Sequence, residues 1–261
     1  MMDKTCSLAQ AIRAIAPGSL LAIGGLMLHR RPMAAVREII RARIGDLTLL
    51  GATLGLDADL LVGAGLARRV RTCYFGLEAF GLAPMFTRAA SAGTLEIVEE
   101  TETSIACGLR ATLARVGFVA SPAWLGTDFL RVRPDVRTVA DPYTGETCVA
   151  FPAIAPDVAL IHALEADPLG NAILGGNLAV DWELSLAART VIVTAERIVP
   201  RLSAEADLLG QRVTHVVAAP NGAAPTSCHP LYPLDAQAIL AYVEACASDR
   251  FQEYLSAWLQ T

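Results

Sequence analysis

Two adjacent glycines followed by three basic residues form the first stretch of the chain whose residue types could do chemistry. The stretch reads IGGLMLHRRPM, and its candidate ligand-binding residues are Gly24, Gly25, His29, Arg30 and Arg31. Glycine has no Cβ atom, so backbone amides here can approach an oxyanion, a thioester carbonyl or a phosphate. The basic side chains add positive charge just before a helix that Pro32 opens, and a helix N-terminus is itself an anion site. A tight turn followed by solvated arginines is the alternative, and the glycine spacing matches neither the dinucleotide-binding nor the ATP-binding motif.

An acidic stretch, EETETS at residues 99–104, supplies the second candidate. Glu102 lies between the end of an expected strand and the start of an expected helix, where open α/β sheets place their ligand sites. At such a position the helix dipole favours the ionised form by roughly 0.3–1 kcal/mol, whereas burial can raise the pKa of a carboxylate by about 3–5 units. A carboxylate poised near neutrality could act first as a general base and then as a general acid. In the alternative, Glu102 belongs to an acidic rim and Thr101 or Thr103 caps the helix.

Other polar residues are weaker candidates. Thr127 and Asp128 follow a glycine and could orient substrate or a partner, with an ordinary turn as the alternative. His162 lies in an apolar strand and is interpreted as a core histidine, while Glu196 follows a strand end and is interpreted as structural. The six cysteines contain no C-x-x-C pair and no cysteine-histidine cluster. This pattern predicts buried free thiols in a reducing cytoplasm and no metal site.

The elements that must position these residues alternate between strands and helices. In the first part of the chain we expect strands at 19–23, 47–51, 69–76 and 94–100, and helices at 7–16, 32–42, 57–67, 84–93 and 103–117. An apolar stripe of Met33, Val36, Ile39 and Ile40 on one face indicates the helix at 32–42. Residues 117–150 contain three prolines and are expected to be irregular with short β pieces. Further strands are expected at 157–167, 190–196 and 213–220, followed by two amphipathic helices at 234–247 and 250–259. The alternation predicts one α/β domain over residues 1–261, with an open, mostly parallel sheet and helices on both faces.

Composition narrows the class of protein. Hydrophobic residues make up 54% of the chain and charged residues 18%, which indicates either a large interior or an apolar face covered by a partner. The net charge of −5 provides no basic field for nucleic acid. No apolar run is long enough to span a membrane, and Pro17-Gly18 argues against a signal peptide. A cytoplasmic protein is therefore expected.

In this combination the chain resembles the α subunit of the family I coenzyme A transferases, of the glutaconate type. The matching segments are IGG…RRPM within 23–33, WLGTD at 124–128, PDVALIHALEADPLGN at 156–171 and TVIVTAERIV at 190–199. The resemblance covers nearly the whole chain and implies an open, Rossmann-like α/β fold. It also implies an acyl-CoA substrate, no permanently bound cofactor, and a partner β chain, with two α and two β chains in the complex.

The same family contains a branch that opens the last steroid ring while the substrate is held as a CoA thioester. Where transferase α chains tend to carry a Ser-Asn pair, this chain has Thr101-Glu102, and the ring-opening branch has a glutamate there. The Cys-Gly-Leu at residues 107–109 and the Arg-x-Pro-Met at 30–33 also follow that branch. The resemblance therefore implies hydrolytic carbon-carbon ring opening, with Glu102 as general base and acid. The glycine-loop amides or Arg30 would hold the developing negative charge.

Two alternatives stay open. In a true coenzyme A transferase the nucleophile is a glutamate of the β subunit, and this chain would only help to bind the acyl-CoA. In a non-catalytic acyl-CoA-binding module there would be no turnover at all.

Overall fold

A single twisted sheet organises most of the molecule, which we describe for residues 2–260 from a computed structural model. Seven of its eight strands run in the order β11–β10–β8–β1–β2–β3–β4, and all neighbours in this order are parallel. The short β9 pairs antiparallel with β8. The prediction of an open, mostly parallel sheet is therefore confirmed. Its strands are β1 (Leu20–Ile23), β2 (Leu47–Leu54), β3 (Ala67–Phe75), β4 (Glu96–Glu99), β8 (Val158–Ala166), β9 (Ala172–Ile173), β10 (Thr190–Ile198) and β11 (His215–Ala218).

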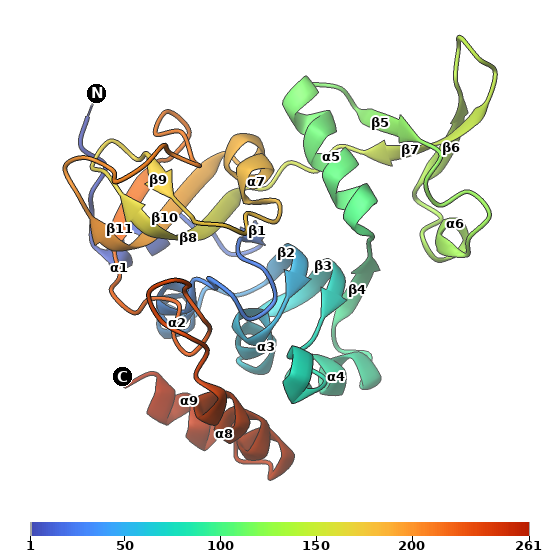
Figure 1. Cartoon of the computed structure of the whole chain (residues 1–261). Coiled ribbons are helices and arrows are strands. Elements are labelled where there is room, and N and C mark those ends of the chain that lie inside the picture. Colours follow the sequence, from blue (N-terminus) through green and yellow to red (C-terminus); the bar gives the residue numbers. More distant parts are fainter. Residues whose placement is uncertain (1, 261) are drawn as a thin grey trace.

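Helices cover both faces of this sheet because successive strand residues point to opposite sides. Leu21 and Ile23 of β1 belong to one apolar core, while Ala22 between them belongs to the other. The first core includes side chains of α1 (Leu8–Ile12), α2 (Met33–Arg41), α3 (Leu56–Gly63), α8 (Ala236–Ala247) and α9 (Phe251–Trp258), and α4 (Pro84–Ser91) packs against it. The second is covered by α5 (Glu102–Ala114) and α7 (Asp181–Ala187). Figure 1 shows these two layers below and above the sheet.

Residues 118–152 form a lobe that projects beyond the edge strand β4 (Figure 1). Its strands pair antiparallel in the order β5–β7–β6, around a small core that contains Trp124 and Phe151. The lobe approaches α5 at Gly108, where a Cβ atom would lie 2.9 Å from the Pro152 carbonyl oxygen. The lobe has a small core of its own, which is separate from the two cores of the main sheet. A single domain over residues 1–261 stays a prediction. The lobe elements are β5 (Phe118–Ser121), α6 (Phe129–Val132), β6 (Arg137–Ala140) and β7 (Thr147–Pro152).

Local sequence signals account for some of the element ends. Ser7 forms a capping box with Gln10 at the start of α1, and α2 buries the predicted stripe that includes Met33 and Ile39. The helices α6 and α7, the two-residue β9 and a short 3-10 helix (Glu78–Phe80) were not expected from the sequence. The six cysteines are free, as predicted, although only Cys228 and Cys246 are buried. No helix within the described residues is long and apolar enough to cross a bilayer.

Candidate active site

Glu102 is the first residue of α5, directly after the carboxyl end of β4. Thr101 precedes it as the N-cap, and the Thr101 hydroxyl accepts the Ser104 amide at 3.1 Å. The capping role therefore falls on Thr101 and leaves the Glu102 carboxylate free for another task. Glu102 is exposed, and its carboxylate makes no hydrogen bond or ion pair with any residue from 2 to 260.

A cavity of about 260 Å³ joins Glu102 to the glycine loop. Its walls come from the loop, from β2, from α5 and from the segment before α7. Most of the lining is aliphatic, and ligand sites are usually cavities with an apolar lining and a few polar groups. The lining residues are Leu26, Ala52, Thr53, Glu102, Ala106, Ala179 and Val180. The structure thus brings Glu102 and the residue after Gly25 to one cavity, although they are 76 positions apart in the chain.

The two glycine amides do not face this cavity as donors, which corrects the sequence-based expectation. The Gly24 amide donates to the Leu160 carbonyl at 2.9 Å, and the Gly25 amide donates to the Asp181 carboxylate at 2.9 Å. Glycine is needed for close approach to protein atoms rather than to a ligand. A Cβ atom on Gly24 would lie 2.6 Å from Asp181 Oδ1, and Gly25 has a φ of +84°.

Arg30 and Arg31 are also turned inward. Arg30 is fully buried, pairs with Asp181 at 2.9 Å, and donates to the carbonyls of His162 and Asn177 at 2.9 and 2.6 Å. Arg31 is equally buried, pairs with Asp57, and donates to the Thr53 carbonyl at 3.1 Å. A buried guanidinium must be paired to offset its lost hydration. The expectation that these two groups offer positive charge to a ligand is therefore corrected, because they hold the loop in place instead.

His29 occupies the turn of the glycine loop and is half-buried. Its Nδ1 lies 3.0 Å from the Ser227 hydroxyl. Burial lowers the pKa of His29, and the nearby Arg30 and His229 lower it further, so the imidazole is mainly neutral at pH 7. His29 does not line the cavity that contains Glu102.

Thr127 and Asp128 lie in the lobe rather than in the cavity. The Thr127 hydroxyl donates to the Trp124 carbonyl at 2.8 Å, and Asp128 makes an exposed ion pair with Arg131 at 3.3 Å. Their segment is tied to the site indirectly, because the Trp124 indole donates to the Thr101 hydroxyl at 3.0 Å. This link joins the lobe to the residue just before Glu102.

Two site residues were missed by sequence reasoning. Asp181 anchors the glycine loop from the other half of the chain, and nothing in the sequence links it to that loop. Cys73 lies within β3, two residues before the end of the strand, and donates its thiol proton to the Ala52 carbonyl. Burial raises the pKa of Cys73, and the carboxylates of Glu102 and Glu100 raise it further. The strand-end argument that selected Glu102 could not have found Cys73, because Cys73 lies inside the expected strand at 69–76.

One group of side chains could hold a metal ion among the residues that the structure describes. It consists of His162, Glu196 and Cys228, whose ligand atoms lie within 4.8 Å of one another. Glu196 already accepts hydrogen bonds from His162 at 2.8 Å, from the Asn221 amide at 2.6 Å and from Tyr232. Burial alone would raise the pKa of Glu196, but these hydrogen bonds outweigh it and lower the pKa. The contacts fit the interpretation of His162 as a satisfied core histidine and of Glu196 as structural.

Comparison with known proteins places this geometry in a family. The family model described as coenzyme A transferase matches residues 5–216. One subunit of the 3-oxoadipate CoA-transferase of Pseudomonas knackmussii is 34% identical over 265 residues, which cover 99% of this chain and 93% of that protein. The cholesterol ring-cleaving hydrolase IpdA subunit of Rhodococcus jostii is 33% identical over 276 residues, with 98% and 92% covered.

A solved structure supports the same assignment. One chain in the crystal structure of a variant of the decarboxylase AibA/AibB superposes with a TM-score of 0.94 at 35% identity, and the match covers 100% of both chains. The chain described here therefore belongs to the coenzyme A transferase family. The family that the sequence motifs implied is confirmed.

Proposed function

We propose that this chain is the α subunit of a heteromeric enzyme that opens a ring of a cyclic CoA thioester by hydrolytic carbon-carbon cleavage. The observation that carries the proposal is the unpaired carboxylate of Glu102 in a mainly apolar cavity shared with the glycine loop. The similarity to a cholesterol ring-cleaving hydrolase subunit supports a steroid-derived substrate.

Glu102 acts as general base and then as general acid in the proposed reaction. Its carboxylate takes a proton from water, and the resulting hydroxide adds to a ring carbonyl carbon. The carbon-carbon bond next to that carbonyl then breaks, its electron pair passes to the leaving carbon, and a carboxylic acid forms. Glu102 returns its proton to the leaving carbon, so that one water is consumed.

Negative charge that develops in this reaction needs hydrogen-bond donors other than the glycine amides and Arg30. Those groups already bind acceptors within this chain. The amides of Glu102 and Thr103 at the start of α5 have no acceptor within the described part of the chain. Unpaired amides at a helix N-terminus favour negative charge. We assign them this role, together with groups from the second chain.

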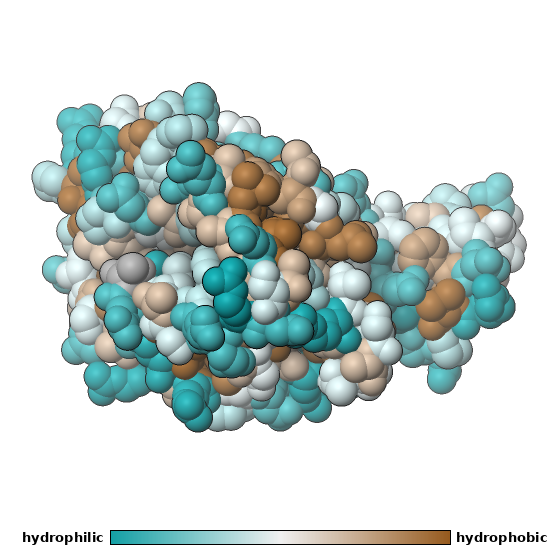
Figure 2. All heavy atoms as spheres, turned by 90° about the horizontal axis from the view of Figure 1, so that it is seen from below, coloured by the Kyte–Doolittle hydropathy of each residue, from teal (hydrophilic) through white to brown (hydrophobic). Residues whose placement is uncertain are grey.

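A β subunit completes the site in this proposal. The cavity is open and Glu102 is exposed, so a second surface is needed to exclude water. The lobe carries exposed Phe118, Leu125, Val132 and Tyr143, which is more apolar surface than an isolated lobe requires. Figure 2 shows the lobe as a narrower projection with apolar side chains at its surface. Co-expression with the neighbouring reading frame, followed by native mass measurement, should give two α and two β chains.

The proposed enzyme uses coenzyme A only as part of its substrate and holds no permanent cofactor. Its six free thiols support the cytoplasm as its location.

The decisive experiment compares Glu102→Gln with the wild type in the assembled complex. Turnover of cyclic CoA esters, followed by mass analysis, should fall by about 10²–10⁴-fold because general acid-base catalysis contributes on that scale. Glu99→Gln is the matched control, since Glu99 is exposed nearby but does not line the cavity. Near-full turnover by Glu102→Gln would eliminate the proposed role.

Release of CO₂ should be followed in parallel, because one similar structure is a decarboxylase.

A true coenzyme A transferase is the second candidate, and the similarity to a 3-oxoadipate CoA-transferase subunit favours it. Its nucleophile would be a glutamate of the β subunit. Borohydride or hydroxylamine should then trap an enzyme-CoA thioester on the β chain, whereas the hydrolase should give no such adduct.

A further inference from the structure

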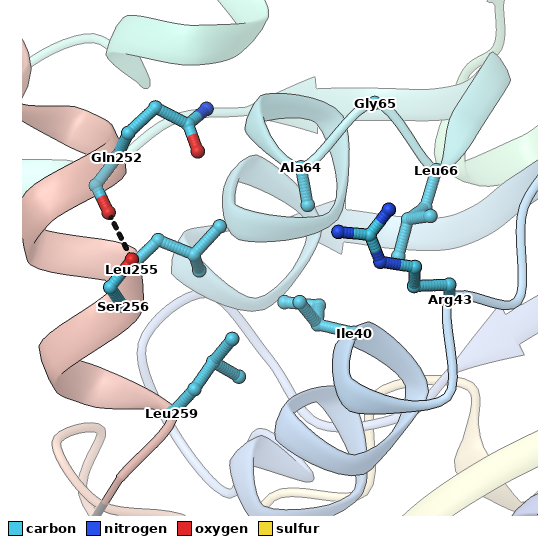
Figure 3. Close-up of a pocket in the computed structure, with 9 residues that line it drawn as sticks. All are labelled: Ile40, Arg43, Ala64, Gly65, Leu66, Gln252, Leu255, Ser256 and Leu259. Atoms are coloured by element: carbon cyan, nitrogen blue, oxygen red, sulfur yellow. Dashed lines mark hydrogen bonds between the residues drawn. The ribbon is translucent and has the colours of Figure 1, made fainter.

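A second cavity, of about 450 Å³, lies where the ends of α2 and α3 meet α9 (Figure 3). It lies at the end of the main sheet where the parallel strands begin, whereas Glu102 lies at the end where they finish. Arg43 precedes the start of β2 and Leu66 precedes the start of β3, so both mark the amino ends of parallel strands. Glu102 follows the carboxyl end of β4. The cavity is therefore separate from the candidate active site. It is lined by Ile40, Arg43, Ala64, Gly65, Leu66, Gln252, Leu255, Ser256 and Leu259.

Arg43 occupies a backbone position at which the neighbouring helices use glycine. It follows the C-cap of α2 with a left-handed φ of +51°. Gly65 and Gly93 follow the C-caps of α3 and α4 with φ values of +71° and +65°. Glycine is preferred there because a Cβ atom is unfavourable in this conformation. An arginine at this position gives up backbone stability that glycine would keep, as Arg115 does at the end of α5.

The Arg43 side chain reaches over the cavity. Figure 3 shows its guanidinium group directed toward Ala64. Arg43 is exposed, and within residues 2–260 its guanidinium has no hydrogen bond and no ion pair. By contrast, the neighbouring Arg41 is engaged, since it donates to the Leu259 carbonyl at 3.0 Å and so fastens the end of α9 to α2. The cavity thus has a fixed wall and one free cation among the described residues.

The remaining lining defines the chemistry of a ligand. Ile40, Leu66, Leu255 and Leu259 supply branched aliphatic side chains, and the Gln252 carboxamide lies at the rim. The Ser256 hydroxyl is already used, because it donates to the Gln252 carbonyl at 2.8 Å. A single guanidinium above aliphatic groups matches a ligand with one negative charge and a short hydrocarbon part. We infer that this cavity binds a small amphipathic carboxylate, with its carboxylate on Arg43 and its chain against the leucines.

The test uses octanoate as the probe and octanamide as its uncharged analogue. Calorimetric titration of the α/β complex with octanoate should give saturable binding with a Kd of about 1 mM or tighter. Arg43→Gly should weaken octanoate binding about tenfold or more, because a charge-assisted hydrogen bond is lost. Its thermal midpoint should equal or exceed that of the wild type, since glycine suits the left-handed backbone. Octanamide should bind at least about tenfold more weakly than octanoate.

Arg115→Gly is the matched control. Arg115 also has a left-handed backbone at the end of a helix, but α5 lies on the other face of the sheet. This variant should gain similar stability and keep octanoate binding unchanged. A second variant, Ser256→Trp, should fill the cavity from an exposed position and abolish binding without lowering the thermal midpoint.

Three outcomes would overturn the inference. They are no saturable octanoate binding by the complex, unchanged binding by Arg43→Gly, and equal binding of octanamide. The inference is independent of the proposed catalytic role, so Glu102→Gln should bind octanoate like the wild type whatever its turnover.

Discussion

The carboxylate of Asp181 lies 2.9 Å from the amide nitrogen of Gly25, although the two residues are 156 positions apart. The same carboxylate pairs with the buried guanidinium of Arg30 at 2.9 Å. One side chain at the start of α7 therefore fixes the glycine loop from the other half of the chain. The cavity that holds Glu102 is bounded by this loop and by the segment before α7, so its shape depends on that contact.

Asp181→Asn should destabilise the protein strongly. The variant leaves Arg30 charged and fully buried without its carboxylate, and breaking a buried pair in this way costs about 3–5 kcal/mol. The free energy of unfolding from urea denaturation measures the effect. Asp249→Asn removes an ion pair of similar length, with Arg88 at 3.0 Å, but that carboxylate is exposed. It should change stability by about 0–1 kcal/mol. Equal effects of the two variants would contradict the anchoring role.

Gly25→Ala should be much more harmful than Gly65→Ala. Both glycines have a left-handed φ, at which alanine costs about 1–2 kcal/mol. At Gly25 a Cβ atom would also lie 2.6 Å from the His29 carbonyl oxygen, whereas Gly65 has open space. Overpacking adds about 1–3 kcal/mol at Gly25 alone. Thermal unfolding of both variants checks the difference, and similar midpoints would show that the loop tolerates a side chain.

Asp59 should make stability depend on pH. Burial raises the pKa of this carboxyl from 3.8 to about 6, although it accepts hydrogen bonds from Tyr242, Phe86 and Met85. Because the folded pKa lies above the unfolded one, the contribution of Asp59 is present below about pH 4 and is lost as pH rises through 6. A shift of about two units corresponds to roughly 3 kcal/mol.

Asp59→Asn tests this linkage. Relative to the wild type, the variant should gain stability as pH rises from 4 to 7, by up to roughly 3 kcal/mol in urea denaturation. A difference between the two proteins that does not change with pH would rule out Asp59 as the titrating group.

The reactivity of Cys73 should report the position of Glu102. Burial raises the pKa of Cys73 and the Glu102 carboxylate adds to the increase. In Glu102→Gln the pKa of the thiol should fall toward its ordinary value, so iodoacetamide should alkylate Cys73 faster at pH 8. Peptide mass analysis gives the rate at each cysteine. Cys107 serves as an internal reference, because burial and Arg110 set its pKa rather than Glu102. An unchanged Cys73 rate would mean that the two groups are not neighbours.

The hydrophobic periodicity and the succession of strands and helices along the chain were predictable because they depend on local pattern, whereas the order of the strands in the sheet was not predicted. The stripe of Met33, Val36 and Ile39 identified α2, and the apolar run before Gly24 identified β1. Glu102 could be placed near the carboxyl ends of the strands, because ligand sites of open parallel sheets lie there. The structure puts Glu102 at the start of α5. The lobe was less predictable, since its short antiparallel strands are held by pairings across turns rather than by a strong hydrophobic period.

The amino-acid sequence by itself determined the alternation of strands and helices, the glycine turn after β1 and the acid at the start of α5. It also contained the motifs that mark the family. Only the tertiary structure decided which way Arg30 and Arg31 point. Their partners, Asp181 and Asp57, are brought near by the packing of α7 and α3 on opposite faces of the sheet. A buried charge is stable only beside its counter-charge, and that distance is set by the fold and not by position along the chain.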